Sequence, residues 1–144
     1  MSKIFSIRWP KLGKAIEAEI IEAQDQALKE RFWNALPFSS IQSHAVCAGI
    51  QMYCPFRLVC IPSNPFLEPM NEQIIGRINL ELDFQYLAIN YGLMEEPVPA
   101  LPIAQVREQD MDIIKLVGEM AWRNLLFSNE FIEVHFEKME GGTD

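Results

Sequence analysis

Apolar and polar side chains alternate along residues 14–22, near the start of the chain. Alternation with a period of two is typical of a strand that buries one face, because successive side chains of a strand point to opposite sides. Residues 3–9 and 14–22 are therefore predicted as two strands joined by a turn at residues 10–13. The apolar positions of the second strand are Ile16, Ala18 and Ile20, and its polar positions are Glu17 and Glu19.

Two later stretches repeat their apolar residues at helical spacing. The first covers residues 25–36, where Asp25 can cap the N-terminus and Pro37 ends the helix. The second covers residues 110–127 and has Asp110 at its start. The predicted buried stripes are Ala27, Leu28, Phe32, Ala35 and Leu36 in the first helix and Ile113, Val117, Met120, Ala121 and Leu125 in the second.

Between the two helices, residues 41–54 alternate strictly except at Ala48 and Gly49, where a two-residue turn suits a hairpin. Folding the chain there pairs small or apolar residues on one face. The other face carries the polar pairs of the hairpin, and it makes an imidazole and a phenol cross-strand neighbours. These predicted pairs are His44 with Tyr53 and Val46 with Gln51.

The rest of the chain predicts further short strands separated by loops. Residues 57–61 read as a strand and residues 62–71 as a proline-rich loop. Residues 74–91 change their apolar parity, which predicts two strands with a turn or bulge between residues 81 and 85. The remaining predictions are an exposed acidic and proline-rich loop over 95–102, a short edge strand over 103–106 and a last strand over 131–136.

Length and composition indicate one compact domain outside the membrane. The chain has 144 residues, of which 49% are apolar and 22% charged. No apolar run approaches the roughly 20 residues of a membrane span, and the N-terminus lacks the features of a signal peptide. We expect a single domain over 1–144, with an N-terminal edge strand and turn at 1–13 and a flexible tail at 137–144. The expected location is the cytoplasm.

The charge distribution argues against nucleic acid as a partner. The net charge is −8, whereas phosphate binding needs a basic surface. Four basic residues fall within the first 14 positions and are interpreted as a solvated strand edge: Lys3, Arg8, Lys11 and Lys14.

Three cysteines, Cys47, Cys54 and Cys60, fit neither a disulfide framework nor a metal site, and they are interpreted as reduced core thiols. We expect no metal and no cofactor.

The order of these elements, together with four short motifs, resembles small bacterial cyclophilin-like barrel proteins of an uncharacterised family. The resemblance covers roughly residues 14 to 136. It implies a mainly β protein with two helices, in which a closed antiparallel β-barrel is capped by helices near 25–36 and 110–127. The motifs are residues 32–38 (FWNALPF), residues 43–45 (SHA) with Gly49 in the turn, residues 76–78 (GRI) and residues 88–92 (AINYG).

Cyclophilins that isomerise prolyl bonds place an arginine on the strand after the first helix. Residues 32–56 contain no arginine or lysine, so prolyl isomerase activity is not expected. Related small barrels in carboxylase and amidohydrolase systems handle small acids and amides. The resemblance therefore implies a groove that binds a small carboxylate- or amide-containing ligand.

The candidate ligand-binding residues are His44, Tyr53 and Gln51, with Trp33 and Arg77 as possible rims of the groove. Arg77 could hold a carboxylate through two hydrogen bonds, and the aromatic rings could line an apolar wall. Tyr86 and Tyr91 are interpreted as structural.

Three alternatives to a binding groove stay open. His44 is the one candidate catalytic residue, as an acid or base of a hydrolase or amide-processing enzyme, and a second titratable group within hydrogen-bond reach of it would favour that function. His44 and Tyr53 could instead be packed residues with satisfied hydrogen bonds. The chain could also be a structural module that forms homo-oligomers through strand edges.

Overall fold

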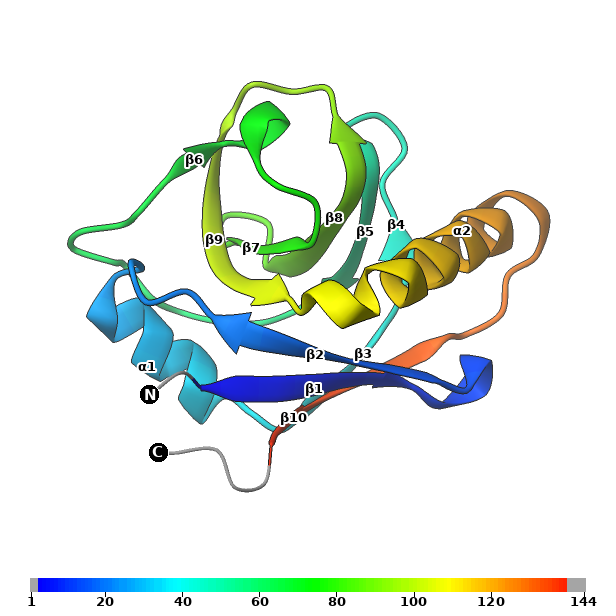
Figure 1. Cartoon of the computed structure of the whole chain (residues 1–144), viewed down its shortest axis with the longest axis horizontal. Helices are drawn as coiled ribbons and strands as arrows, with labels where there is room; N and C mark the ends of the chain where they lie inside the picture. The colour runs from blue at the N-terminus through cyan, green and yellow to red at the C-terminus, as the bar shows by residue number, and fades with distance from the viewer. Residues whose placement is uncertain (1–2, 140–144) are drawn as a thin grey trace.

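The computed structural model describes residues 3–139 and is mainly β with two helices, as the sequence predicts (Figure 1). The helices are α1 (Gln26–Asn34) and α2 (Met111–Phe127), with short 3-10 turns η1 (Pro10–Leu12), η2 (Met70–Glu72) and η3 (Glu108–Asp110). The strands are β1 (Ile4–Trp9), β2 (Lys14–Ile20), β3 (Phe38–Ile41), β4 (Ser43–His44), β5 (Gly49–Pro55), β6 (Glu68–Pro69), β7 (Arg77–Glu81), β8 (Tyr86–Met94), β9 (Pro99–Val106) and β10 (Glu133–Lys138).

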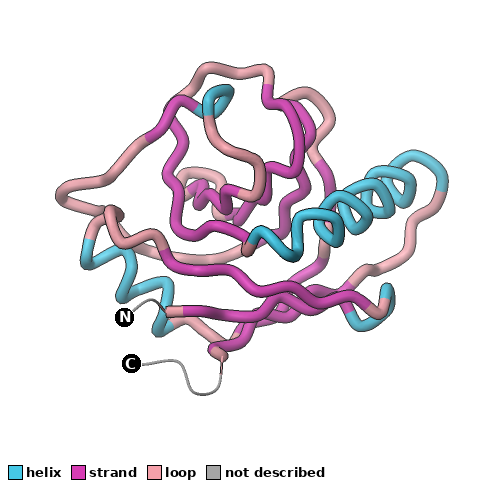
Figure 2. The backbone as a smooth tube through the Cα atoms, in the orientation of Figure 1, coloured by secondary structure: helices cyan, strands magenta, loops and turns pink. Residues whose placement is uncertain are grey.

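The strands form a nearly closed antiparallel barrel. Their order is β3-β10-β1-β2-β9-β7-β8-β5-β4, and β6 pairs with β9. The two ends of this order, β3 and β4, are separated in the chain by Gln42 alone. The two ends of the sheet are therefore one residue apart, so the sheet must curl back on itself. The tube in Figure 2 shows this curl.

Gln42 is buried at the point where the sheet closes, and its groups bond to both sides. Its backbone N–H donates to the carbonyl of Ile132 beside β10 at 2.8 Å, and its side-chain Nε2 donates to the Tyr53 carbonyl of β5 at 2.9 Å. Its Oε1 accepts a hydrogen bond from Trp9 Nε1 at 2.9 Å. One glutamine thus joins β1, β5 and the chain before β10, which stabilises the closure.

The core follows the alternation seen in the sequence. Phe5, Ile7 and Trp9 of β1 are fully buried. The Asp25 side chain accepts a hydrogen bond from the Leu28 N–H at 3.1 Å and so caps α1, as predicted. The helix then buries Leu28 and Phe32, and the Phe32 ring meets Phe5 edge-on at 5.3 Å between ring centres.

Helix α2 contacts β2, β4, β5 and β8, and in Figure 1 it runs above β2 from the end of β9. Its start is not capped by Asp110, because the Asp110 carboxylate accepts a hydrogen bond from the Glu17 N–H of β2 at 2.8 Å instead. The buried face carries Ile114, Val117, Gly118 and Ala121. The prediction was right for Val117 and Ala121, whereas Met120 and Leu125 are exposed. That the helices cap the barrel stays a prediction.

The predicted hairpin register is wrong by one residue. Strand β4 has only two residues, and Ser43 pairs with Tyr53 and His44 with Met52. A slip of one residue moves every side chain of a strand to the other face. His44 therefore shares a face with Met52, and Tyr53 points to the opposite side.

Several other boundaries differ from the sequence prediction. Residues 57–61 form no strand. Residues 103–106 belong to β9, which pairs with β2 and β7 and is not an edge, and β1 lies between β10 and β2, so it is not an edge either. Residues 137 and 138 are in β10 rather than in a tail, and residues 140–144 lie outside the described part of the chain. The predicted turn over 81–85 is confirmed, with Gln85 at a φ of 61°.

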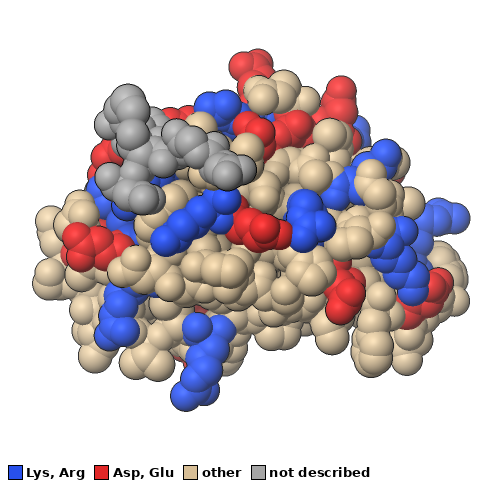
Figure 3. Space-filling view, turned by 90° about the horizontal axis from the view of Figure 1, so that it is seen from below, with Lys and Arg blue, Asp and Glu red and all other residues tan. Residues whose placement is uncertain are grey.

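The basic residues near the N-terminus are partly paired with acids. Arg8 contacts Glu137 at 2.7 Å, and Lys11 contacts Glu130 at 2.6 Å. Figure 3 shows basic and acidic side chains interleaved on the underside of the molecule, without a continuous basic field. Within residues 3–139, no helix is both long and apolar enough to cross a membrane.

Candidate functional site

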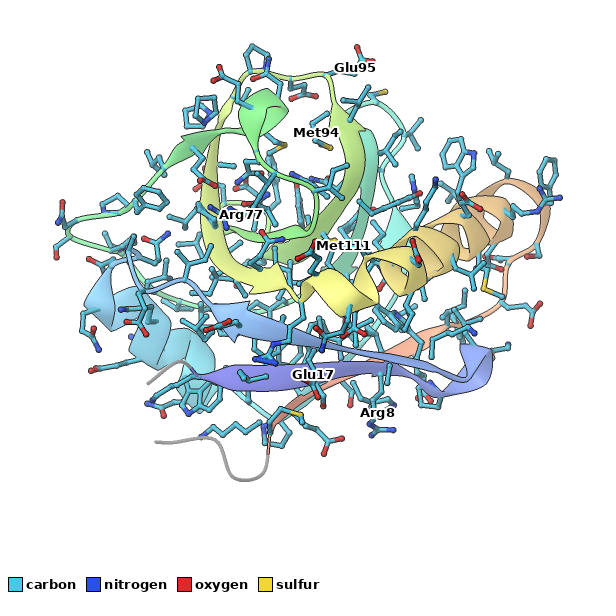
Figure 4. The ribbon with its side chains drawn as sticks, viewed as in Figure 1. Arg8, Glu17, Arg77, Met94, Glu95 and Met111 are labelled. Atoms are coloured by element: carbon cyan, nitrogen blue, oxygen red, sulfur yellow. The ribbon has the colours of Figure 1, made fainter. Side chains whose placement is uncertain are left out.

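A groove of about 890 Å³ lies between α2 and the β4–β5 connection. Its walls come from four places in the chain. Met111 at the start of α2 and Glu95 after β8 both line it, and both are labelled in Figure 4. Its lining residues are His44, Ala45, Val46, Cys47, Gly49, Ile50, Ile75, Tyr91, Gly92, Leu93, Glu95, Met111, Asp112, Lys115, Glu119 and Trp122.

His44 and Tyr91 form a hydrogen-bonded pair at the wall of this groove. The His44 Nδ1 lies 2.7 Å from the Ala45 carbonyl oxygen, and its Nε2 lies 2.5 Å from the Tyr91 hydroxyl. A carbonyl can only accept, so Nδ1 carries the proton of the neutral ring and Nε2 accepts from the phenol. The pair is therefore a directed chain, from the Tyr91 O–H through the imidazole to the backbone.

Burial keeps both members of this pair neutral. It lowers the pKa of His44 below its ordinary value of 6.5, and the hydrogen bond to Ala45 opposes this only in part. It also raises the pKa of Tyr91 to about 12, and the nearby Glu119 carboxylate acts in the same direction. At neutral pH the site therefore presents an uncharged imidazole and a protonated phenol.

Helix α2 supplies the opposite wall of the groove. The Trp122 ring lies 4.9 Å from the His44 ring between centres. Asp112, Lys115, Glu119 and Trp122 are three or four positions apart, which places them on one face of the helix.

The charges that line the groove are mostly negative. Glu95, Asp112 and Glu119 are acidic, and Lys115 is the basic residue among the lining side chains. Such a site favours a ligand that carries a positive charge, and Lys115 offers one place for an anionic or carbonyl group.

The structure does not bring the five predicted site residues together. His44 lines the groove, but Gln51 and Tyr53 lie on the other face of β5. Gln51 Nε2 donates to Asn90 Oδ1 at 2.8 Å, and the Tyr53 ring packs beside Tyr86 at 5.1 Å between centres. The expected cross-strand partner of His44 is thus replaced by Tyr91 of β8.

Arg77 and Trp33 are also away from the groove. Arg77 Nε and Nη2 each donate to one oxygen of the Glu68 carboxylate at 2.9 Å, so the carboxylate that Arg77 holds belongs to the protein. Trp33 is buried under Lys3 and Lys138, whose ammonium groups lie 5.1 and 5.3 Å from the ring centre. Neither residue lines the groove.

Sequence reasoning missed the residues of α2 and interpreted Tyr91 as structural. Their spacing was the signal available in the sequence, because residues 112, 115, 119 and 122 recur on one helical face with both charge and an aromatic ring. Tyr91 could not be assigned to the groove without knowing which strand lies beside β5.

Of the three cysteines, Cys47 lines the groove. Of the three cysteines, which are all free, Cys54 is buried as predicted, Cys60 is half-buried and Cys47 is exposed at the groove. Burial raises the pKa of the Cys54 thiol to about 12. Within residues 3–139, no three histidine, cysteine or acidic side chains gather to hold a metal ion.

The comparisons with known proteins find the fold in solved structures. No protein-family model and no curated protein matches the chain. A structure of McbB in complex with tryptophan matches with a TM-score of 0.85 and 24% identity over 97% of this chain. This chain spans 46% of that one, less than half of its length. The solution structure of the hypothetical protein AF2241 from Archaeoglobus fulgidus matches with a TM-score of 0.57 and 11% identity, covering 96% of this chain and 95% of that one. At these identities, the likeness shows a shared fold.

Proposed function

We propose that the protein binds a small organic molecule in the groove beside His44. The observation that carries this proposal is the grouping of a neutral His44–Tyr91 pair, the Trp122 ring and charged side chains around one groove of about 890 Å³. Binding sites for small molecules are typically concave and largely apolar, with a few polar groups that fix orientation. The His44–Tyr91 chain supplies such a polar group at a fixed place.

The charges define the ligand class more narrowly. Three acids against one lysine favour a ligand with an amino group. Lys115 suits a carboxylate of the same ligand, the Tyr91 oxygen can accept from an amide N–H, and Trp122 suits an aromatic ring. The resulting class is an aromatic amino acid or its amide. The McbB structure, which contains tryptophan, supports this class because the two chains share their fold.

A thermal-shift series with four indole compounds tests this proposal. Tryptophan, tryptophanamide and tryptamine carry an ammonium group, whereas indole-3-propionate carries only a carboxylate. A ligand that binds only the folded state raises the melting temperature. We expect the three amines to raise it and indole-3-propionate to have little effect. The same rise for all four compounds, or for none, would contradict the proposed ligand class.

Matched variants assign the binding to the groove. Glu119→Gln removes one groove charge at constant size, and Glu30→Gln makes the same change at an exposed position of α1, away from the groove. Glu119→Gln should weaken the binding of the three amines, and Glu30→Gln should leave it unchanged. If both variants reduce the rise in melting temperature equally, the rise depends on the net charge of the protein and not on the groove.

A second function, an enzyme that uses His44 as a base or acid, is supported by one observation. Tyr91 is a second titratable group within hydrogen-bond reach of the imidazole. As a base, neutral His44 can accept the phenol proton while the Tyr91 oxygen takes a proton from a bound molecule. Tyr91→Phe separates the two functions: an enzyme would lose turnover at nearly unchanged ligand affinity, and a binding protein would show only the change in affinity.

We also infer that the chain is a cyclophilin-like barrel that works in the cytoplasm. The order of its elements supports the first part, and the three free cysteines support the second. A module that forms homo-oligomers through strand edges has less support, because the sheet ends β3 and β4 meet at Gln42. Size-exclusion chromatography with light scattering tests it.

A further inference from the structure

A second cavity, of about 470 Å³, lies on the face of the β5–β8 pair that points away from the groove. Residues that are adjacent in the sequence line different cavities. Ile50 and Glu95 line the groove, and Gln51 and Glu96 line the second cavity. Because one strand pair separates them, a ligand in either space leaves the other free.

A chain of hydrogen-bonded side chains, mostly amides, ends at Gln51, which lines the second cavity. It begins at Glu68, whose carboxylate accepts from Arg77 at 2.9 Å and from Gln73 Nε2 at 3.0 Å. The Gln73 Oε1 accepts from Asn90 Nδ2 at 2.8 Å. Asn90 Oδ1 in turn accepts from Gln51 Nε2 at 2.8 Å.

Glu68 fixes the direction of this chain. The Arg77 guanidinium holds the pKa of Glu68 below its ordinary value, so the carboxylate is ionised and can only accept. Gln73 must therefore turn its amide nitrogen toward Glu68 and its oxygen toward Asn90. Each amide repeats this orientation, and the chain ends with the Gln51 amide nitrogen turned inward.

The last group of the chain is the Gln51 oxygen, which is left without a donor. Gln51 is only 3% exposed, and its Oε1 accepts no hydrogen bond from any residue among 3–139. Gln51 lines the cavity, so this oxygen is free for whatever enters it. Gln51 Oε1 is not among the buried side-chain polar atoms that lack a partner, so it keeps contact with open space, and its free lone pairs suit a molecule with an N–H donor.

The opening of the cavity is acidic. Three acids line it, and no lysine or arginine does. Burial raises the pKa of Tyr86 above its ordinary value, and the negative charges of Glu81 and Glu96 raise it further. The other lining residues are mainly apolar: Leu82, Phe84, Val98 and Leu101 are among them, and the third acid is Asp83.

We propose that this second cavity binds a primary ammonium group carried on an apolar body. An N–H of the ammonium donates to Gln51 Oε1, the acids Glu81, Asp83 and Glu96 balance its charge, and the apolar part lies against the cavity wall. The site is separate from the groove and does not depend on the function proposed for it.

Three benzyl compounds separate the elements of this proposal. Benzylamine offers a positive charge and N–H donors, benzyltrimethylammonium offers the charge without donors, and benzyl alcohol offers a donor without the charge. Binding is followed by NMR on ¹⁵N-labelled protein, where the Gln51 side-chain NH₂ reports on the second cavity and the Trp122 indole N–H reports on the groove. We expect benzylamine to shift the Gln51 signals and to bind at least ten-fold more tightly than either analogue.

Substitutions at the site and away from it complete the experiment. Gln51→Met keeps a similar size but removes the acceptor oxygen, and it should weaken benzylamine about ten-fold, as expected for one hydrogen bond to a charged group. Gln26→Met is the matched control at an exposed position of α1 and should have no effect. If Gln51→Met does not fold, the double variant Glu81→Gln/Glu96→Gln, at a half-buried and an exposed position, tests the same site and should also weaken binding.

Three results would overturn the proposal. Benzyltrimethylammonium could bind as tightly as benzylamine, or both sets of variants could keep wild-type affinity. Benzylamine could also shift only the Trp122 signal, in which case the groove is the sole site and its proposed function survives. A shift at Gln51 without one at Trp122 would support the second site whatever the outcome at the groove.

Discussion

The Tyr91 ring lies directly against the backbone of Gly118 in α2. A Cβ atom built on Gly118 would overlap the Cε1 and Cζ atoms of that ring. Gly118 therefore provides the space that lets the phenol reach His44 Nε2. The glycine lies in the middle of a helix, where it costs about 1 kcal/mol relative to alanine. The missing side chain at Gly118 leaves the room that Tyr91 occupies between the sheet and the helix.

Gly118→Ala should destabilise the protein by about 1–3 kcal/mol, since an added methyl group in a packed core forces its neighbours to move. It should also weaken any ligand of the groove, because Tyr91 must shift. Urea denaturation measures the first effect and thermal-shift titration the second. In a Tyr91→Ala background the same change should become neutral or stabilising by up to about 1 kcal/mol through helix propensity. Destabilisation in both backgrounds would show that the Tyr91 contact is not its cause.

The burial of His44 predicts a loss of stability in mild acid. Its pKa is lower in the folded protein than its ordinary value of 6.5. As the pH falls below about 6.5, the unfolded chain takes up this proton first, so the free energy of unfolding decreases until the folded pKa is passed. Denaturation of wild-type protein and of His44→Gln between pH 5 and 8 measures the difference. The variant should lack the part of the decline that His44 causes, and parallel curves would contradict the assignment.

Gln42→Leu should open the closure of the barrel. The change leaves the buried Trp9 Nε1 without an acceptor and removes the bond from Gln42 Nε2 to the Tyr53 carbonyl. An unpaired buried polar group costs about 1–3 kcal/mol, so the loss should be at least that large. Chemical denaturation measures it, and amide hydrogen exchange should rise first in β3 and β4. Adding Trp9→Phe should recover part of the loss, and no recovery would place the cost elsewhere.

Arg77→Met should destabilise the segment that carries β6 and η2. It removes the paired hydrogen bonds to Glu68 and the bond to Gln105 at 3.1 Å. The side chains of Arg77 and Glu68 are 18% and 21% exposed, so we expect a loss of about 1–3 kcal/mol rather than that of a fully buried pair. Hydrogen exchange over residues 68–76 measures the local effect. Arg8→Met, at an exposed pair with Glu137, is the control and should cost less than 1 kcal/mol.

Local patterns predicted the elements of the fold well, but they did not predict how the strands pair. The alternation over β1 and β2, the Asp25 cap and the turn before β8 are properties of short stretches, and all three are confirmed. The central position of β1 depends on β10, which is about 130 residues away in the chain. No local pattern contains that information, so the prediction of an edge strand was wrong.

The candidate site shows the same limit. His44 was found because a buried strand with a single histidine is conspicuous in sequence. Its partner was assigned by assuming a two-residue turn at Gly49, but residues 45–48 form a longer connection and move the register by one. The partners of His44 come from β8 and α2, and only the tertiary structure brings these elements to it.

The most direct test of the groove is ¹⁵N NMR of the histidine rings during a tryptophan titration. The chain has two histidines, so His135 on β10 serves as an internal control. In the free protein, the His44 ring should be neutral with its proton on Nδ1. Tryptophan should then shift the His44 ring signals in a saturable way and leave those of His135 unchanged. Unchanged His44 signals at millimolar tryptophan, or equal shifts of both rings, would contradict binding beside the His44–Tyr91 pair.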